Sequence, residues 1–221
     1  MSGVPLAVRI QREDVLHFLG YGRGRGPGAR IEEALGAVLD EARALAAPQG
    51  LHRILAPGCA GALGLEPRSR ASLAVGLVTI GRDLEQRVTA LLAEGEATHA
   101  LLLDAAGSAA AEEAAGELER LLRGERPSRR FSPGYGSWPL TAQRALFDLL
   151  PHAEIGVRLL PSCLMTPRKS VSFALWLGAG EDLATGEEPG SVRCETCGLV
   201  SCPYRRHAPA GETDPSPGEE A

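Results

Sequence analysis

The 221-residue sequence contains no uninterrupted apolar run of about 18 residues, the length that a membrane-spanning helix requires. Its first residues also lack the apolar core of a signal peptide. Basic residues are in the minority, with 23 Lys and Arg against 28 Asp and Glu and a net charge of −5. General nucleic-acid binding requires a basic face, so this balance argues against it. We therefore expect a cytoplasmic protein with no membrane and no nucleic-acid partner.

Signatures of several enzyme classes are missing too. The glycine-rich stretch at residues 20–28 fits no G-x-G-x-x-G register and is followed by no Walker Gly-Lys-Ser/Thr, so we interpret it as a Gly/Arg loop. The five histidines are scattered and form no recognisable catalytic triad. Five cysteines, an odd number, fit a reducing compartment better than a disulfide framework.

Hydrophobic residues make up 44% and charged residues 23% of the chain, both ordinary for a globular protein. Apolar spacing predicts helices over residues 31–46, 83–94, 97–123 and 141–150, the last with Thr141 as its N-cap. Strands are predicted at 51–55, 73–80, 157–160 and 171–177, whereas 15–19 is a short apolar segment and 59–65 is unassigned. These elements predict an α+β domain over residues 1–180 with a sheet of about five short strands.

Residues 130–136 read Arg-Phe-Ser-Pro-Gly-Tyr-Gly. Pro133 fixes its own φ, while the glycines at 134 and 136 permit φ values that other residues resist. Such a turn exposes backbone polar groups beside Arg130, which can grip a carboxylate with two hydrogen bonds. The pattern suits a shallow pocket for a zwitterionic small molecule. On composition alone, an ordinary Gly/Pro surface turn is the alternative.

The C-terminal part divides into a linker with a Cys-rich segment, residues 181–206, and a tail, residues 207–221, with the composition of disorder. The segment places Cys194, Cys197 and Cys202 in a C-x2-C-x4-C pattern. Three thiolates are metal ligands for structural Zn or an Fe–S cluster, but the spacing matches neither paired zinc knuckles nor the usual ferredoxin order. A redox-active dithiol and free thiols stay open as alternatives. A fourth ligand is equally open among His207, Cys163 and Cys59.

The Arg130–Gly136 motif resembles the activation (reactivation) domain of cobalamin-dependent methionine synthase, where it reads R-P-x-P-G-Y-P. It is more similar to free-standing S-adenosylmethionine-binding members of that family, with R-F-S-P-G-Y-G. Four further blocks continue the likeness over about residues 15–178: Val78–Gly81; Asp104, Gly107, Ser108 and Glu112 in a D-x-x-G-S-x-x-x-E pattern; Gln143 with Ile155–Val157; and Met165–Ser172. The resemblance implies a twisted, largely antiparallel sheet flanked by helices.

The resemblance also implies a function: binding S-adenosylmethionine (AdoMet) and supporting reductive remethylation of cob(II)alamin on a separate corrinoid protein or cobalamin-dependent methyltransferase. Arg130 would hold the methionine carboxylate and Glu112 the cationic end, with Glu113 as the rival. Backbone groups around Ser132 and Gly134 would contact the adenosine. Tyr135 would lie near the sulfonium and the corrin as the catalytic candidate, since an aromatic face attracts a cation.

The chain has no Asp-x-His-x-x-Gly corrinoid-binding motif, so we expect a partner to supply the cobalamin and another to supply electrons. The protein would then be an accessory component of a methyltransferase. Arg168 and Lys169 would face either an anionic cofactor edge or water. Two other functions stay open: a non-catalytic AdoMet-binding regulatory module, and a metal or Fe–S electron carrier for a corrinoid protein.

Overall fold

The computed structural model describes residues 3–21, 26–122, 128 and 130–178. Its helices are α1 (Arg12–Phe18), α2 (Ala29–Leu45), α3 (Asp83–Ala93), α4 (Ala97–Leu122) and α5 (Ala142–Asp148), with 3-10 turns η1 (Cys59–Leu63) and η2 (His152–Ile155). Its strands are β1 (Val4–Pro5), β2 (Gln49–Leu55), β3 (Ser72–Thr79), β4 (Arg158–Leu159), β5 (Met165–Thr166) and β6 (Ser170–Leu177).

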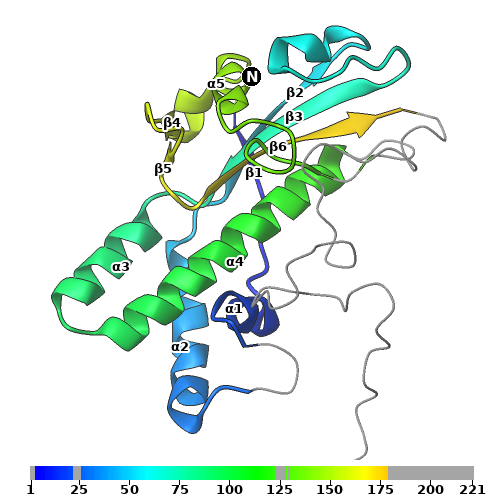
Figure 1. Ribbon diagram of the computed structural model, residues 1–221. Coiled ribbons are helices and arrows are strands. Elements are labelled where there is room, and N and C mark those ends of the chain that lie inside the picture. Colours follow the sequence, from blue (N-terminus) through cyan, green and yellow to red (C-terminus); the bar gives the residue numbers. More distant parts are fainter. Residues whose placement is uncertain (1–2, 22–25, 123–127, 129, 179–221) are drawn as a thin grey trace, which may run out of the picture.

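Four strands form one antiparallel sheet in the order β1-β2-β3-β6, while β4 and β5 form a separate two-stranded ribbon (Figure 1). The expected α+β class, with an antiparallel sheet flanked by helices, is confirmed. The main sheet has four strands in the described residues, where about five were expected. Residues 157–160 do carry a strand, but β4 pairs with β5 across the tight turn between them and never reaches the main sheet.

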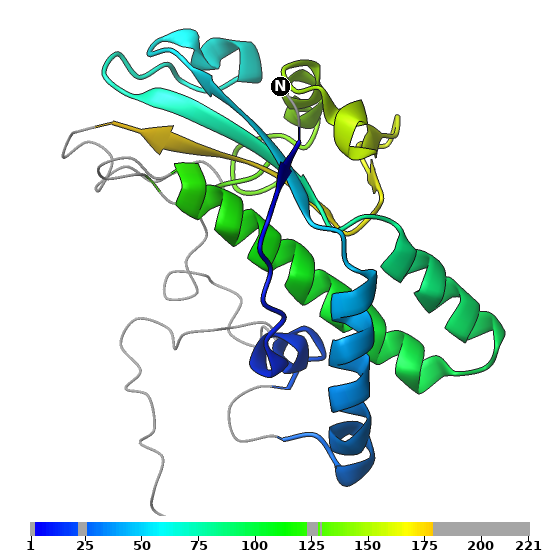
Figure 2. The ribbon, with the colours of Figure 1, turned by 180° about the vertical axis from the view of Figure 1, so that it is seen from behind.

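Helix α4 crosses one face of the sheet, with α1, α2 and α3 packed around it (Figures 1 and 2). Its buried side is mostly alanine, so the sheet and the other helices can approach its backbone closely. The buried alanines are Ala100, Ala105, Ala106, Ala109, Ala110, Ala111, Ala114 and Ala115. Strand residues on this face include Ala74 and Val78 of β3 and Phe173 and Leu175 of β6.

The opposite face of the sheet is covered by η1, α5, and Phe131 and Trp138 from the segment before α5. Leu73, Val75 and Leu77 of β3 point into this second core, together with Ala174 and Trp176 of β6. Successive residues of a strand point to opposite faces, which explains why neighbouring residues of β6 belong to different cores. The sheet is therefore buried on both sides, and β3 is apolar almost throughout.

Two local predictions need correction. Residues 15–19, predicted only as an apolar segment, belong mostly to helix α1, which begins three residues earlier. Thr141 precedes α5 but does not cap it through its side chain, because it already has helical backbone angles of φ −64° and ψ −20°. Its backbone instead continues a tight turn in which the Arg144 N–H donates to the Thr141 carbonyl at 3.2 Å.

Within the described residues, no helix is long and apolar enough to cross a bilayer. The predicted division into a domain, a Cys-rich segment and a tail falls largely on residues 179–221, outside those that the structure describes.

Candidate functional site

The segment that carries the Arg-Phe-Ser-Pro-Gly-Tyr-Gly motif begins beside the outer edge of β6. Phe131 forms an antiparallel bridge with Ala174, exchanging N–H to carbonyl hydrogen bonds of 2.9 and 2.8 Å. Ser128 accepts the Trp176 N–H on its hydroxyl at 2.8 Å and donates its own N–H to the Trp176 carbonyl at 2.9 Å. The backbone of β6 therefore fixes the position of Arg130 between these two residues.

After Phe131 the chain folds into two consecutive turns. The Tyr135 N–H donates to the Ser132 carbonyl, and the Trp138 N–H donates to the Tyr135 carbonyl, both at 3.2 Å. Gly134 and Gly136 have φ values of 93° and 56°, a region that side-chain-bearing residues rarely adopt. The two glycines are therefore required by the backbone conformation, as the sequence predicted.

Trp138, which sequence reasoning passed over, anchors these turns. It is buried, its indole N–H donates to the Leu63 carbonyl at 2.9 Å, and its ring centroid lies 5.2 Å from that of Phe131. An aromatic residue two positions after the Gly-rich motif was the available signal, because a large aromatic side chain contributes much buried apolar surface.

Arg130 extends toward α4 and forms an ion pair with Glu112. Its Nε also lies 3.7 Å from the Glu119 carboxylate, and its guanidinium carbon lies 5.5 Å from the centroid of the Phe173 ring. The Arg130 side chain is only 18% exposed, whereas that of Glu112 is 45% exposed. Within the described residues, the buried Nη1 of Arg130 has no acceptor. A largely buried guanidinium with one unpaired nitrogen thus lies beside a more accessible carboxylate.

The two candidate glutamates have different partners. Glu113 accepts a hydrogen bond from Arg120 at 2.9 Å, further along α4, and so faces away from Arg130. Glu119, which was not predicted, lies seven residues after Glu112 and therefore on the same face of the helix. That spacing was the signal that could have found it.

Tyr135 lies at the tip of the turns, with its residue 61% exposed. Gly134 is also exposed, and Ser132 is partly buried. The structure therefore brings Arg130 and Glu112 together, and it carries Ser132, Gly134 and Tyr135 on the adjoining turns.

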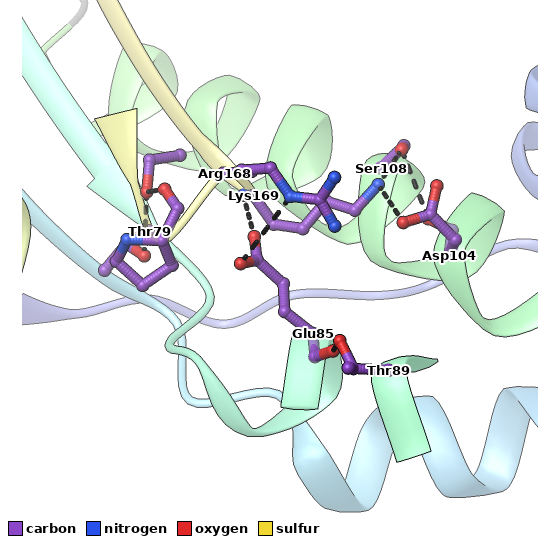
Figure 3. Close-up of polar contacts among 9 residues, drawn as sticks. Thr79, Glu85, Thr89, Asp104, Ser108, Arg168 and Lys169 are labelled. Atoms are coloured by element: carbon purple, nitrogen blue, oxygen red, sulfur yellow. Dashed lines mark hydrogen bonds and ion pairs between the residues drawn. The ribbon is translucent and has the colours of Figure 1, made fainter. Parts of the chain in front are cut away.

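The other motif blocks meet at a second place, which we call the motif junction (Asp104, Ser108, Lys169, Glu85, Thr79 and Ser170; Figure 3). Lys169 Nζ donates to the Ser108 hydroxyl at 2.7 Å and lies 3.0 Å from the Asp104 carboxylate. The Lys169 side chain is 12% exposed, so it faces neither of the two predicted environments. Arg168, in contrast, is 69% exposed and lies 4.0 Å from Glu85.

The same junction fixes the backbone of the turn before β6. The Lys169 N–H donates to Glu85 at 2.6 Å (Figure 3). The Ser170 hydroxyl lies 3.0 Å from Thr79 Oγ1 and donates to the Pro167 carbonyl at 2.8 Å. Thr79 in turn accepts the Gly81 N–H at 3.2 Å at the entry to α3. The sequence blocks around Thr79, Ser108 and Lys169 therefore hold one another in place.

Cys194, Cys197 and Cys202 lie outside the described residues, so the predicted metal site has no structural description. Of the alternatives for a fourth ligand, Cys59 is exposed and Cys163 is buried, and neither forms a disulfide. In the part of the chain that the structure describes, no group of three His, Cys, Asp or Glu side chains is placed to hold a metal ion.

Comparison with protein families gives one match that bears on this arrangement. Residues 82–180 match the family described as vitamin B12 dependent methionine synthase, activation domain. The match includes α4, the Arg130–Gly136 motif, the motif junction from Glu85 onward and β6, and it confirms the resemblance predicted from those blocks.

Solved structures extend the likeness of fold beyond that segment. One similar structure is titled the MetH reactivation domain bound to AdoHcy, with 16% identity and a TM-score of 0.56 over 79% of each chain. At this identity the comparison shows a shared fold, over a larger share of the chain than the family match. The comparison with curated proteins gave no match.

Proposed function

We propose that this activation domain binds AdoMet between Arg130, Glu112 and the turns at residues 132–136. The observation that carries the proposal is the unpaired Nη1 of the mostly buried Arg130. A buried donor without an acceptor costs about 1–3 kcal/mol, a cost that a ligand carboxylate removes. The solved relative that shares the fold is titled as bound to AdoHcy, a molecule with the same amino-acid end as AdoMet.

The charges around Arg130 match a zwitterion. A ligand carboxylate would form a charge-assisted pair with the Arg130 guanidinium. Glu112, with Glu119 behind it, offers negative charge to an ammonium or sulfonium group. The turns at Ser132 and Gly134 would contact the adenosine.

We further propose that the protein presents AdoMet to the cobalamin of a separate corrinoid protein or cobalamin-dependent methyltransferase. There, AdoMet supplies the methyl group and an electron donor supplies one electron, which together return cob(II)alamin to its methylated form and leave AdoHcy. The chain itself contributes orientation and electrostatics. Tyr135, exposed at the tip of the turns, would lie against the sulfonium and the corrin.

Calorimetric titration with AdoMet tests the site. Arg130→Ala is expected to weaken binding by about 1.5–3 kcal/mol, the range for hydrogen bonds to charged groups. Arg120→Ala, which removes an arginine paired with Glu113 and Glu117 on α4, is the matched control and should leave affinity unchanged. Equal affinities for wild type and Arg130→Ala would refute the assignment.

The paired glutamates give a second test of the same site. Glu112→Gln should weaken AdoMet binding with little change in thermal stability, whereas Glu113→Gln should be silent because Glu113 faces Arg120. The opposite pattern would assign the ligand to Glu113.

A methyl-transfer assay separates the proposed activity from a purely regulatory role. The protein would be mixed with a corrinoid protein, a reductant and AdoMet labelled in its methyl group. Label on cobalt supports reactivation, with Tyr135→Leu expected to slow transfer more than it weakens AdoMet binding. Binding without any transfer would favour the regulatory module.

A further inference from the structure

A hollow with a volume of about 470 Å³ lies where α3 meets the ribbon of β4 and β5, at the end of the sheet where β3 ends and β6 begins (Figures 1 and 2). Its lining comes from three segments, within residues 82–89, 156–158 and 166–168. None of the lining residues belongs to the Arg130–Glu112 pair or to the turns at residues 132–136. The volume falls within the range of about 300–1,000 Å³ found for small-molecule sites.

Positive charge is concentrated in this hollow. Each of the three segments contributes one arginine, namely Arg82, Arg158 and Arg168. Among the described residues of the lining, Glu85 is the one carboxylate, so three positive charges and one negative charge leave a formal charge of +2. The whole chain, in contrast, has a net charge of −5. Three guanidinium groups around one hollow repel one another, and a bound anion would relieve that repulsion.

The arginine side chains are available to such an anion. Arg82 and Arg158 are exposed, and neither side chain forms a hydrogen bond or ion pair with another described residue. Arg168 is 69% exposed and lies 4.0 Å from Glu85 (Figure 3). Glu85 is 15% exposed, and its carboxylate already accepts the Lys169 N–H at 2.6 Å. The carboxylate of the lining therefore leaves two of the three guanidinium groups without a counter-charge.

Backbone contacts hold the three segments in place without using the arginine side chains. Arg158 pairs with Thr166 across the ribbon of β4 and β5. The motif junction ties the turn that carries Arg168 to α3. Arg82 directly follows Gly81, whose N–H donates to the same junction at the entry to α3. The backbone positions from which the arginines reach the hollow are thus fixed before a ligand binds, which lowers the entropic cost of binding.

The number and type of these charges favour a phosphate group. Guanidinium groups stay protonated at neutral pH and bind phosphate oxygens through pairs of parallel hydrogen bonds. A phosphomonoester carries a charge of about −1.5 to −2 near pH 7 and three acceptor oxygens, so it can satisfy more than one arginine. A monocarboxylate has one charge and would leave the second unpaired arginine without a partner. The recessed shape favours a small molecule over the flatter surface of an acidic protein.

We propose that the hollow between Arg82, Arg158 and Arg168 binds a small phosphorylated molecule through a phosphomonoester or diphosphate group. Arg82 and Arg158 hold the phosphate oxygens, and Arg168 adds a third positive charge from the turn before β6. This site is separate from the proposed AdoMet site and goes beyond the proposed function.

Calorimetric titration of the full chain tests the proposal. Inorganic diphosphate and glycerol 3-phosphate would be the two probes, with sodium chloride at equal ionic strength as the control. We expect saturable binding of at least one phosphate compound and no saturable signal with chloride. Tighter binding of diphosphate would assign the hollow to two adjacent phosphoryl groups, and tighter binding of glycerol 3-phosphate would assign it to a monoester; either result supports the proposal.

Four variants assign the signal to the hollow. Arg82→Ala and Arg158→Ala should each weaken binding of the preferred probe roughly tenfold. Arg158→Lys should recover part of that loss, because it keeps the charge but not the two-pronged guanidinium. Arg70→Ala removes an exposed arginine outside the lining and, as the matched control, should leave binding unchanged. Thermal unfolding would show that each variant is folded.

Three results would overturn the proposal: no saturable binding of either phosphate compound, wild-type affinity in folded Arg82→Ala and Arg158→Ala, or binding of a poly-glutamate peptide through these arginines when neither phosphate compound binds. The last result would assign the surface to an acidic protein instead. Arg130→Ala should leave phosphate binding unchanged, so the proposed AdoMet site and the proposed phosphate site can fail separately.

Discussion

Lys169 and Ser108 are 61 residues apart in the sequence, yet the Lys169 ammonium donates to the Ser108 hydroxyl at 2.7 Å. Asp104, one helical turn before Ser108, supplies the opposite charge at 3.0 Å. The pair joins the middle of α4 to the turn that leads into β6. The long helix is thereby tied to the strand beside which Arg130 lies.

This pairing predicts that Lys169→Met destabilises the fold by about 1–3 kcal/mol, because a mostly buried hydrogen-bonded cation is lost and the Ser108 hydroxyl loses its donor. Arg168→Ala, at the exposed neighbouring position, should change stability by less than about 0.5 kcal/mol. Urea unfolding of both variants measures the difference. Equal losses would mean that the turn, and not the Lys169 contacts, determines stability.

Gly76 predicts a second effect on stability. It lies opposite Phe173 in the β3–β6 pair, and a Cβ added there would lie 2.5 Å from the Phe173 ring. Gly76→Ala should destabilise the protein by about 1–3 kcal/mol through overpacking. It should also weaken AdoMet binding, since the displaced Phe173 ring supports Arg130.

Gly116→Ala is the matched control for that substitution. A Cβ there would have only Arg120 Nη1 at 3.7 Å and Glu113 Oε2 at 4.0 Å nearby. The change should raise helix stability by roughly 0.5–1 kcal/mol, because alanine loses less backbone entropy than glycine. Thermal unfolding that shows a loss in both variants would contradict the packing argument.

Glu41 predicts how stability depends on pH. Burial raises its pKa, but hydrogen bonds from Arg87 at 2.9 Å and with His99 at 2.6 Å outweigh this, and on balance its pKa lies below the ordinary value of 4.5. A carboxyl with a lowered folded pKa stabilises the protein above its unfolded pKa. That contribution is lost as the pH falls below 4.5 and through the folded value.

Urea unfolding between pH 7 and about pH 3 would measure this dependence. The free energy of unfolding should fall less steeply with acid in Glu41→Gln than in wild type. Glu33→Gln, an exposed change on the same helix, should reproduce the wild-type slope. Parallel curves for wild type and Glu41→Gln would show that other carboxyls account for the acid sensitivity.

The cysteine segment stays a prediction. Anaerobically prepared protein should carry Zn or Fe bound by Cys194, Cys197 and Cys202, because a short segment with little apolar sequence gains order mainly from a metal. Truncation after Gly190 should remove the metal and spare AdoMet binding. If the truncated protein no longer binds AdoMet, the tail is part of the ligand site. If intact reduced protein carries no metal, the segment contains three free thiols or a dithiol.

The sequence predicted helices and strands well where the apolar residues followed one regular spacing over many residues. The helix expected at 97–123 is observed as Ala97–Leu122, and the strand expected at 73–80 is Ser72–Thr79. The strand β1 has only two residues, too few to show the alternation of a strand. The helix α1 has seven, too few for its apolar spacing to distinguish a helix from a strand. The spacing of apolar residues therefore predicted the long helices and strands but not the short ones.

Contacts within the site depend on information that local pattern does not contain. Glu112 and Glu113 are both helix carboxylates in sequence, and only the packing of Arg130 against α4 distinguishes them. The Lys169 contacts and the Trp138 to Leu63 hydrogen bond likewise join residues from distant segments. Family resemblance identified the blocks, but their geometry required the fold.

The bridge between Phe131 and Ala174 has a consequence for the sheet itself. Without the segment at residues 128–131, β6 would be an open edge strand with unpaired N–H and carbonyl groups, a template for pairing with another molecule. At the far edge, the two-residue strand β1, which ends in Pro5, pairs with β2 only at Gln49 and Gly50. A substitution that detaches the segment from β6 would therefore promote self-association and aggregation as well as the loss of a ligand.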